Sequence, residues 1–134
     1  MITPAQAQTF LTENFAPWVL DLGITVDAVA PDETLLTVPI TPRLARHGGI
    51  VSGQALAALA DTAMVLACGG FLGQMRPVAT VTLDTQFLRP ATGDQLRARA
   101  KVIKGGRSMM FAQCTIAAAP AGKDVAFASA SFAI

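Results

Sequence analysis

The pattern of apolar and polar residues places one helical stretch among β-rich segments. Residues 53–68 are apolar on nearly every side of a helix, since alanine and leucine dominate and Asp61 is the one charged residue. Ser52 is the expected N-cap, and Gly69-Gly70 is expected to end the helix after about four turns, roughly 24 Å. A helix without a polar face must be covered on all sides. The pattern therefore predicts a buried core helix.

The segments on both sides of this helix are typical of β-strands. A hairpin is expected over residues 23–30 and 34–40, and four further strands over residues 78–88, 95–104, 107–119 and 125–134. In two of them apolar and polar residues alternate: Val81, Leu83 and Phe87 against Thr80, Thr82, Asp84 and Gln86, and Leu96, Ala98, Ala100 and Val102 against Arg97, Arg99 and Lys101. The pattern predicts that each set lies on one face of a sheet.

This order of elements predicts an α+β fold in a single domain, residues 1–134, with an antiparallel sheet around the helix. Thr3 and Pro4 are a typical N-cap and first helical residue, so residues 1–20 are expected to form a helical flank. A sheet of this kind has open edges. We therefore expect a homodimer at least.

The composition favours a second copy of the chain as partner and argues against nucleic acid and membranes. Apolar residues make up 52 % of the chain, charged residues 14 %, and the mean hydropathy is +0.49. A net charge of +1 argues against nucleic acid and acidic membranes as partners. A membrane span over residues 48–75 is disfavoured because a central Asp61 costs about 2.5–3.5 kcal/mol on insertion scales. With no signal-like start and no paired cysteines, we expect a cytoplasmic protein.

Asp61 is the sharpest candidate for chemistry, because a carboxylate in an apolar helix is costly to desolvate. The alternative is a side chain that simply reaches solvent or caps a neighbouring backbone group. Ser52 and Gly53, at the helix start, offer free amides for a developing oxyanion. A hydrolytic triad of Ser52, His47 and Asp61 is disfavoured, because Ser52 does not lie in a G-x-S-x-G turn.

Other chemistry finds little support in the sequence. One histidine and scattered carboxylates do not supply a metal site, so we expect neither a metal nor another cofactor. Cys68 and Cys114 lie among apolar residues and are expected to be packing thiols. The segment 105–107 (Gly-Gly-Arg) is too short for a phosphate-binding P-loop and is expected to be a hairpin turn.

Three segments in order, residues 53–64, 80–91 and 104–108, resemble the hotdog-fold acyl-CoA thioesterases of the phenylacetate-pathway, PaaI-like type. The resemblance implies an antiparallel sheet wrapped around one long helix and a dimer with a continuous sheet. It also implies a possible dimer of dimers, with two active sites at each dimer interface. The expected substrate is an acyl-CoA.

The resemblance implies roles for individual residues. Asp61 corresponds to the catalytic acid, Gly53 to the glycine whose amide polarises the thioester carbonyl, and Thr80 to an assisting hydroxyl. The implied substrate-binding residues are Arg46, Ser52, Gln54, Phe87, Arg107, Ser108 and Met109. Arg107, with Arg89 as a further candidate, would meet the CoA phosphates, and Leu56, Met64, Phe15 or Trp18 would line the acyl pocket.

The sequence departs from the family pattern at two places. Where many members have His-Gly-Gly, nine residues before the aspartate, this chain has Ser52-Gly53-Gln54, and a literal His47-Gly48-Gly49 lies five residues upstream. We favour Gly53 because the apolar pattern before Asp61 then stays in register, and the upstream triplet remains the alternative. Arg46 stands where the family commonly has asparagine.

The implied reaction is hydrolysis of an acyl-CoA thioester to free acid and CoA, with Asp61 as general base or nucleophile. A non-catalytic hotdog module that binds acyl-CoA is the alternative, and the replacement at Arg46 keeps it open. A hydratase or dehydratase is disfavoured, because one branch of those relatives would need histidine at the position of Leu66.

Overall fold

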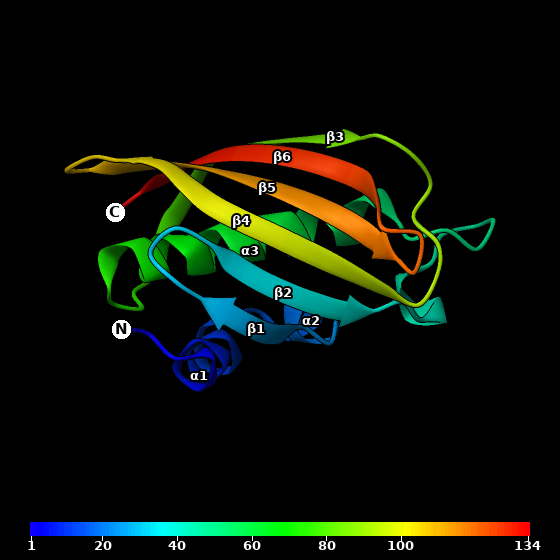
Figure 1. Cartoon of the computed structure of the whole chain (residues 1–134), viewed down its shortest axis with the longest axis horizontal. Coiled ribbons are helices and arrows are strands. Elements are labelled where there is room, and N and C mark those ends of the chain that lie inside the picture. Colours follow the sequence, from blue (N-terminus) through cyan, green and yellow to red (C-terminus); the bar gives the residue numbers. More distant parts are fainter.

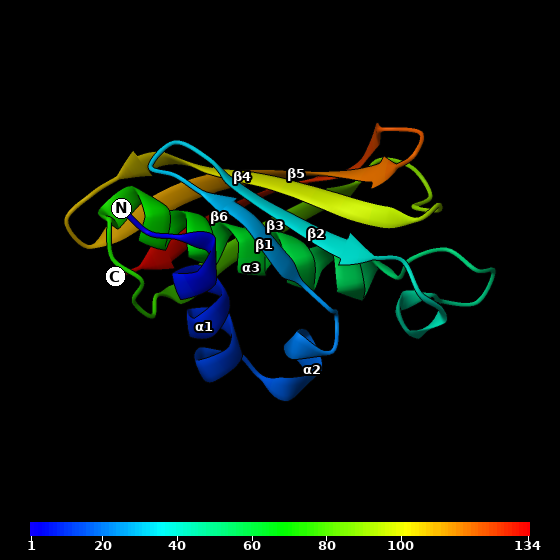
Figure 2. The same ribbon diagram turned by 60° about the horizontal axis from the view of Figure 1, so that its bottom comes forward.

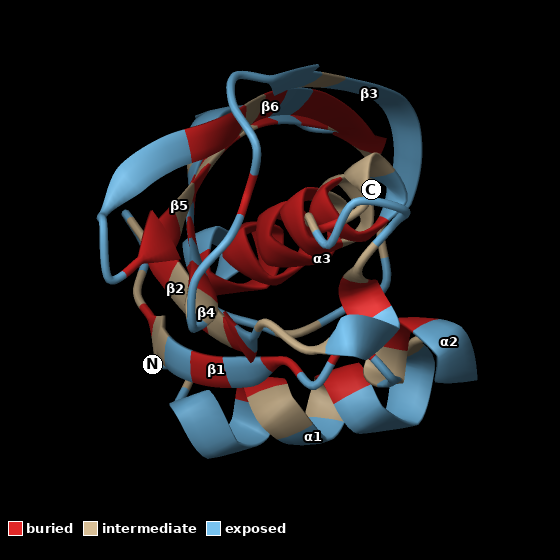
Figure 3. Cartoon of the chain, turned by 90° about the vertical axis from the view of Figure 1, so that its right-hand side faces the viewer, coloured by how far each residue is buried: buried red, intermediate tan, exposed pale blue.

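The computed structural model, which describes residues 1–134, is an α+β fold in which one curved sheet surrounds one long helix (Figure 1). The elements in chain order are α1 (Pro4–Asn14), α2 (Pro17–Leu20), β1 (Thr25–Val29), β2 (Thr34–Pro39), η1 (Pro42–Leu44), α3 (Gly53–Leu72), β3 (Ala79–Phe87), β4 (Gln95–Gly105), β5 (Met109–Ala119) and β6 (Lys123–Ala133). The antiparallel sheet has the strand order β1-β2-β4-β5-β6-β3. Viewed end-on, it curls around α3 (Figure 3), as the sequence predicted.

Helix α3 begins where the sequence predicts, but it ends later. Ser52 is the N-cap, and its Oγ accepts a hydrogen bond from the Ala55 amide at 3.1 Å. The predicted end at Gly69-Gly70 is wrong, because the helix continues to Leu72 and stops at Gly73, whose φ is +73°. A Cβ at Gly69 would lie 2.6 Å from the Met75 sulfur, and one at Gly70 2.8 Å from the Ala30 oxygen. Both glycines therefore permit close packing inside the helix.

Strand β4 carries the alternation that the sequence predicts. Leu96, Ala98 and Ala100 are buried against α3, while Arg97 and Arg99 lie on the outer face. The predicted start of the next strand at residue 107 is two residues too early. The Gly106 amide donates to the Met109 oxygen at 2.7 Å, which closes a turn, so β5 begins at Met109.

Strand β3 departs from its predicted pattern. It lies at one edge of the sheet, and nearly all of its residues are exposed, including Val81 and Leu83. Its register with β6 shifts between Thr80 and Thr82, so that both Thr80 and Leu83 lie opposite buried residues, Phe132 and Ala130. Residues directly opposite each other share a face. The prediction that Thr80 lies on the other face of the sheet from Leu83 and Phe87 is therefore wrong, because the bulge turns Thr80 toward α3.

The N-terminal segment covers the other edge of the sheet. Thr3 and Gln6 form a capping box at the start of α1, which confirms the predicted helix start. α1 packs beside β1 (Figure 2), and the Gln8 side chain bonds to its backbone in both directions. Gln8 Nε2 donates to the Ile24 oxygen at 3.0 Å, and the Val26 amide donates to Gln8 Oε1 at 2.8 Å. These two polar groups at the edge of β1 are therefore satisfied within the chain.

Helix α3 is long and apolar enough to cross a membrane by length and composition alone. In the fold, however, 67 % of its most apolar window is buried inside the protein. The core helix of a folded domain passes the same test. This burial agrees with the buried core helix that the sequence pattern predicts.

Candidate active site

Asp61 and Thr80 form a direct contact between α3 and β3. Thr80 Oγ1 donates a hydrogen bond to Asp61 Oδ1 at 2.9 Å. Burial raises the pKa of the Asp61 carboxyl above its ordinary value, and the hydrogen bond from Thr80 offsets part of that rise. The bulge in β3 is what aims Thr80 at this carboxylate. The site thus has a half-buried carboxylate that is more basic than a solvated one.

Asp61 lies on the one side of α3 that its own sheet leaves partly open. Gln54, Ala57, Ala58 and Asp61 follow the i, i+3, i+4, i+7 spacing of one helix face, and none of them is buried. The other residues of α3 from Ala55 to Gly70 are buried. Alanine at two of these positions leaves room beside the carboxylate. The open side therefore gives a second molecule access to Asp61.

Gly53 is the first residue of α3, and its amide has no hydrogen-bond partner within the chain. The neighbouring bonds use other amides, since Ala55 N–H donates to Ser52 Oγ and Leu56 N–H donates to the Ser52 oxygen. The first amides of a helix point outward along its axis. A Cβ on Gly53 would lie 3.2 Å from Cζ of Phe87. The amide is thus free, and the atoms nearest to a side chain at this position would be those of the Phe87 ring.

The two glycine triplets lie in different surroundings. His47, Gly48 and Gly49 are exposed at the tip of a loop, where Gly48 and Gly49 have φ of +96° and +79° and no atom would touch a Cβ. Gly53 lies instead at the helix start, against Phe87. Ser52 Oγ is engaged as the helix cap, and no hydrogen bond joins it to His47. The geometry of a serine hydrolase triad is absent.

A pocket of ≈ 380 Å³ opens beside Gly53. Arg46 and Arg89 line it together with apolar residues that include Leu56, Phe87 and Pro90. Leu56, one of the residues expected to line an acyl pocket, is thus among the residues that line this one. Met64 is fully buried in the core and Trp18 is 61 % exposed on α2, so neither lines this pocket.

The predicted site residues fall into three groups along α3. Gly53 and Asp61 are eight residues apart, which is roughly 12 Å along a helix axis. Arg107, Ser108 and Met109 lie at the far end, on the hairpin between β4 and β5, where Gly105 contacts Phe71 near the end of α3. A single chain therefore does not bring its predicted groups onto one thioester.

Sequence reasoning missed one polar group on the inner face of β3. Thr85 lies opposite the buried Ala128, in line with Thr80 and Phe87, and its Oγ1 is buried without a hydrogen-bond partner. The alternation of β3 places residue 85 on the same face as Leu83 and Phe87. No signal in the sequence indicates that its hydroxyl would lack a partner.

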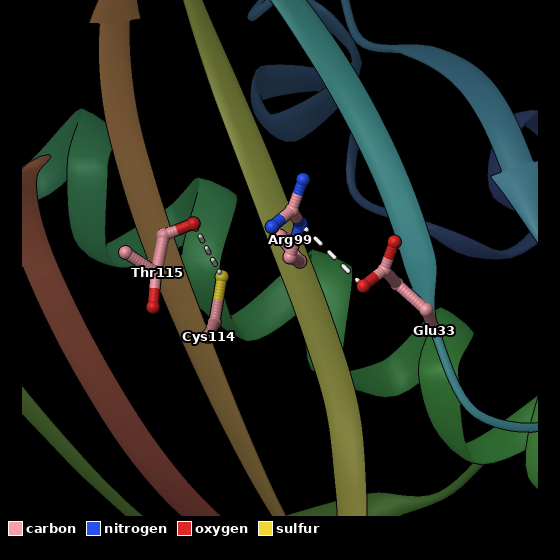
Figure 4. Close-up of polar contacts among 4 residues, drawn as sticks. All are labelled: Glu33, Arg99, Cys114 and Thr115. Carbon is pink, nitrogen blue, oxygen red and sulfur yellow. Dashed lines mark hydrogen bonds and ion pairs between the residues drawn. The ribbon is translucent and has the colours of Figure 1, made fainter. Parts of the chain in front are cut away.

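A cavity of ≈ 950 Å³ lies on the outer face of the sheet, away from Asp61 and Gly53. Arg97 and Arg99 line it, and Arg99 Nε lies 3.5 Å from Glu33 Oε2 (Figure 4). The Cys114 thiol donates to the Thr115 backbone oxygen at 3.8 Å, and Figure 4 also draws this contact. Burial raises the pKa of Cys68 and of Cys114 to about 12, so neither thiol is activated. The predicted role of both as packing thiols agrees with this burial.

Comparison with known proteins identifies the family. Residues 48–123 match the model of the thioesterase superfamily. The chain belongs to that superfamily. Among the named relatives, a "putative esterase" of Halobacterium salinarum is 36 % identical over 100 residues, which cover 71 % of this chain and 66 % of the relative. A "putative esterase" of Haemophilus influenzae is 31 % identical over 114 residues, 81 % of this chain and 83 % of the relative.

Solved structures agree with this assignment to the thioesterase superfamily. A thioesterase family protein from Silicibacter pomeroyi is similar with a TM-score of 0.84 and 25 % identity, over 95 % of this chain and 93 % of that one. The long helix inside a six-stranded antiparallel sheet is the hotdog fold, as the resemblance implied. Together the family and its relatives support hydrolysis of a thioester as the general reaction.

Proposed function

We propose that this thioesterase superfamily member hydrolyses acyl-CoA thioesters and is of the PaaI-like type, with Asp61 as the catalytic carboxylate. The observation that carries the proposal is the contact between Asp61 and Thr80 at the open side of α3. A general base must be ionised at the working pH and still basic enough to take a proton. A carboxyl whose pKa is raised by burial is a stronger base than a solvated one, which suits this role.

The proposed site is shared between two copies of the chain. The roughly 12 Å between Gly53 and Asp61 along α3 is too long for both to act on one carbonyl. In a symmetric dimer joined at the exposed edge of β3, Gly53 of one protomer can approach Asp61 of its partner. A homodimer with a continuous sheet, and further a dimer of dimers, is therefore part of the proposal.

The proposed reaction uses one carboxylate and one oxyanion donor. Asp61 takes a proton from water while the water oxygen bonds to the thioester carbon, and the carbonyl oxygen becomes an oxyanion held by Gly53 N–H. The C–S bond then breaks and CoA leaves as a thiolate, whose conjugate acid has a pKa of about 8.5, so it needs no strong general acid. In the alternative path, the Asp61 carboxylate attacks the carbon itself, the C–S bond breaks and CoA leaves as a thiolate, and water then hydrolyses the resulting mixed anhydride.

The remaining expected residues have defined places in this proposal. Arg107, Ser108 and Met109, on the hairpin between β4 and β5, would hold CoA, and the proposed dimer would bring this hairpin toward the partner's helix start. Ser52, Gln54 and Phe87 would border the carbonyl site beside Gly53. The proposal includes no metal or other cofactor, no nucleic acid or membrane partner, and a cytoplasmic location, which suits two free buried thiols.

Thiol release from a panel of short, medium and aryl acyl-CoAs tests the proposal. Asp61→Asn should lower kcat by about 10²–10⁴-fold with the oligomer intact, as expected for loss of an essential base. Thr80→Val should leave more activity but shift the acidic limb of the pH profile upward, because the Thr80 hydrogen bond lowers the Asp61 pKa. Unchanged hydrolysis by Asp61→Asn would refute the assignment.

The role of the Gly53 amide can be tested with two matched variants. Proline is tolerated at the first position of a helix, so Gly53→Pro removes the N–H while keeping the start of α3. Gly53→Ala keeps the N–H and places a Cβ against the same exposed Phe87 ring. We expect Gly53→Pro to lose about 10²–10³-fold in kcat and Gly53→Ala to lose much less. Equal losses would show that the Cβ, not the amide, matters.

A second candidate function is binding of acyl-CoA without turnover. The observation that favours it is Arg46 in the loop before α3, where the family resemblance implies asparagine. Calorimetric titration with acyl-CoA, alongside the thiol-release assay, separates the two functions. Binding by the wild type with no hydrolysis of any panel member would favour the binding module. Turnover that depends on Asp61 would exclude it.

A further inference from the structure

The strip between α3 and β3 connects the two ends of the proposed site. It runs from the contact of Gly53 with Phe87 to the hydrogen bond between Asp61 and Thr80, and we call this strip the seam. Midway between these ends α3 contributes Ala57, which is only partly buried. A methyl group is the largest side-chain group that the helix places there. Another molecule can therefore approach the inner face of β3 along the seam.

Thr85 lies within the seam and has a hydroxyl without a partner. It pairs with the buried Ala128, so its side chain is on the inner face of β3, two residues from Phe87. Its Oγ1 is buried and makes no hydrogen bond, although the residue as a whole is only half-buried. A buried hydroxyl that lacks a partner costs free energy, and native proteins pair most such groups. The hydrogen bonding of Thr85 is thus incomplete in the chain alone.

The other two threonines of β3 have partners within the chain. Thr80 Oγ1 donates to Asp61, and Thr82 Oγ1 lies 2.6 Å from Ser131 Oγ on the outer face of the sheet. A threonine hydroxyl changes direction by rotation about χ1 between staggered positions. Because the Thr85 hydroxyl has no hydrogen bond to lose, it can turn toward a ligand in the seam without breaking one. Among the threonines of β3, Thr85 is therefore the one available to a ligand.

The two sides of Gly53 differ in charge. On one side lies the pocket that Arg46 and Arg89 line, and no residue of β3 before Phe87 contributes to it. On the other side lies the seam, which carries no charge before its far end. A thioester whose carbonyl meets the Gly53 amide extends in both directions. The phosphate-bearing CoA suits the side with the arginines, which leaves the seam for the acyl group.

We propose that Thr85 is a specificity-determining residue, whose hydroxyl hydrogen-bonds an oxygen substituent of the acyl group, either a hydroxyl or a keto oxygen. This inference rests on the proposed thioester substrate and specifies which acyl groups the site selects. Two residues of a strand span roughly 7 Å, so this oxygen lies several carbon–carbon bonds from the carbonyl beside Phe87. A site with a buried polar group discriminates against ligands that leave that group unpaired.

Thiol release from acyl-CoAs of one chain length tests the proposal. The substrates are hexanoyl-CoA, its ω-hydroxy derivative and the ketone that carries its oxygen on the next-to-last carbon. The measured quantity is kcat/KM for each substrate, in the wild type and in Thr85→Val, which keeps the shape of the side chain but lacks the hydroxyl. Thr85→Ser restores a hydroxyl. Thr82→Val is the matched control, since it removes a hydroxyl from the outer face of the same strand.

The wild type should favour one or both oxygenated substrates over hexanoyl-CoA by about tenfold in kcat/KM. A preference for the hydroxy derivative alone, the ketone alone or both identifies the oxygen that Thr85 binds. Thr85→Val should lose the preference and keep its kcat/KM for hexanoyl-CoA, because the variant has no hydroxyl to leave unpaired. Thr85→Ser and Thr82→Val should both retain the preference. A merely structural role of Thr85 would change kcat/KM for all substrates alike.

No preference in the wild type, a preference that survives in Thr85→Val, or the same loss in Thr82→Val would overturn the proposal. So would a change in the mass of Thr85→Val by light scattering, since the hydroxyl would then pair with a second copy of the chain.

Failure of the proposed hydrolysis is a separate result. If no substrate releases thiol, the corresponding thioethers of CoA, which cannot be hydrolysed, serve as probes in isothermal titration calorimetry. Tighter binding of an oxygenated thioether that is lost in Thr85→Val would uphold the role of Thr85 while the hydrolytic assignment falls. Equal binding of all the thioethers, or binding of none, would overturn this inference as well.

Discussion

The two edges of the sheet differ in whether other parts of the chain cover them. At β1, helix α1 covers the edge, and Gln8 satisfies both the Val26 amide and the Ile24 oxygen. At β3, no element of the chain covers the edge, and Val81 and Leu83 are 57 % and 39 % exposed. Uncovered strand edges are templates for pairing with another chain. The contrast shows which edge is covered within the chain and which is open, and the proposed dimer would form at the open edge.

The same contrast separates structural from functional polar groups. The Gln8 side chain hydrogen-bonds to the backbone at the β1 edge, whereas Thr80, on the open edge strand β3, donates to Asp61. The open edge therefore borders the carboxylate on which the proposed chemistry depends. A partner that closes this edge would also close the site.

The largest expected effect comes from a charge on the open edge. Leu83→Lys should convert the proposed dimer to a monomer at micromolar concentration. The thiol-release rate should then fall about 100-fold or more, because Gly53 of one protomer would no longer lie near Asp61 of the other. Leu83 is partly exposed, so the longer lysine can reach solvent and the monomer should stay folded. Light scattering and circular dichroism check both points. Thr25→Lys, on the closed edge, should change neither mass nor rate.

A mixture of two inactive variants tests whether the site is shared. Asp61→Asn keeps Gly53, and Gly53→Pro keeps Asp61, so a mixed dimer has one complete site of its two. After unfolding and refolding together in equal amounts, we expect about a quarter of wild-type activity, because half of the dimers are mixed. Activity that stays at the level of the separate variants would place both groups in one chain.

The closed edge can be opened by removing one side chain. Gln8→Leu should lose about 1–2 kcal/mol of unfolding free energy, since the Val26 amide and the Ile24 oxygen lose their partner. Urea denaturation measures the loss, and thiol release should remain close to that of the wild type. Thr9→Ala, an exposed change on the same helix, should leave stability nearly unchanged. A marked loss of thiol-release activity in folded Gln8→Leu would contradict a purely structural role for Gln8 at the β1 edge.

The smallest expected effect is the pH dependence that Asp61 adds to stability. Its folded pKa lies above the unfolded value of 3.8, so the folded state holds this proton longer, and stability falls as pH rises from about 4 through the folded pKa. Asp61→Asn removes that fall. The stability of the variant relative to the wild type, from urea midpoints, should therefore increase across this range and level off above it. A difference that is constant with pH would contradict a raised pKa.

Much of the fold could be predicted because local patterns encode it. The apolar run before and after Asp61 identified the core helix, and the alternation of Leu96, Ala98 and Ala100 identified the inner face of β4. The end of α3 could not be predicted, because glycine is both a helix terminator and a residue that permits close packing. At Gly69 and Gly70 the neighbours Met75 and Ala30 decide between these roles.

Sequence alone determined the strands, the buried helix and the single carboxylate within it, because periodicity and desolvation cost depend on residues close together in the chain. It also distinguished Gly53 as a candidate amide donor at the helix start. Only the tertiary structure decided that a bulge turns Thr80 toward Asp61, that Arg46 and Arg89 meet at one pocket, and that β3 alone is left uncovered. These features depend on register and on contacts between distant segments, which local patterns do not contain.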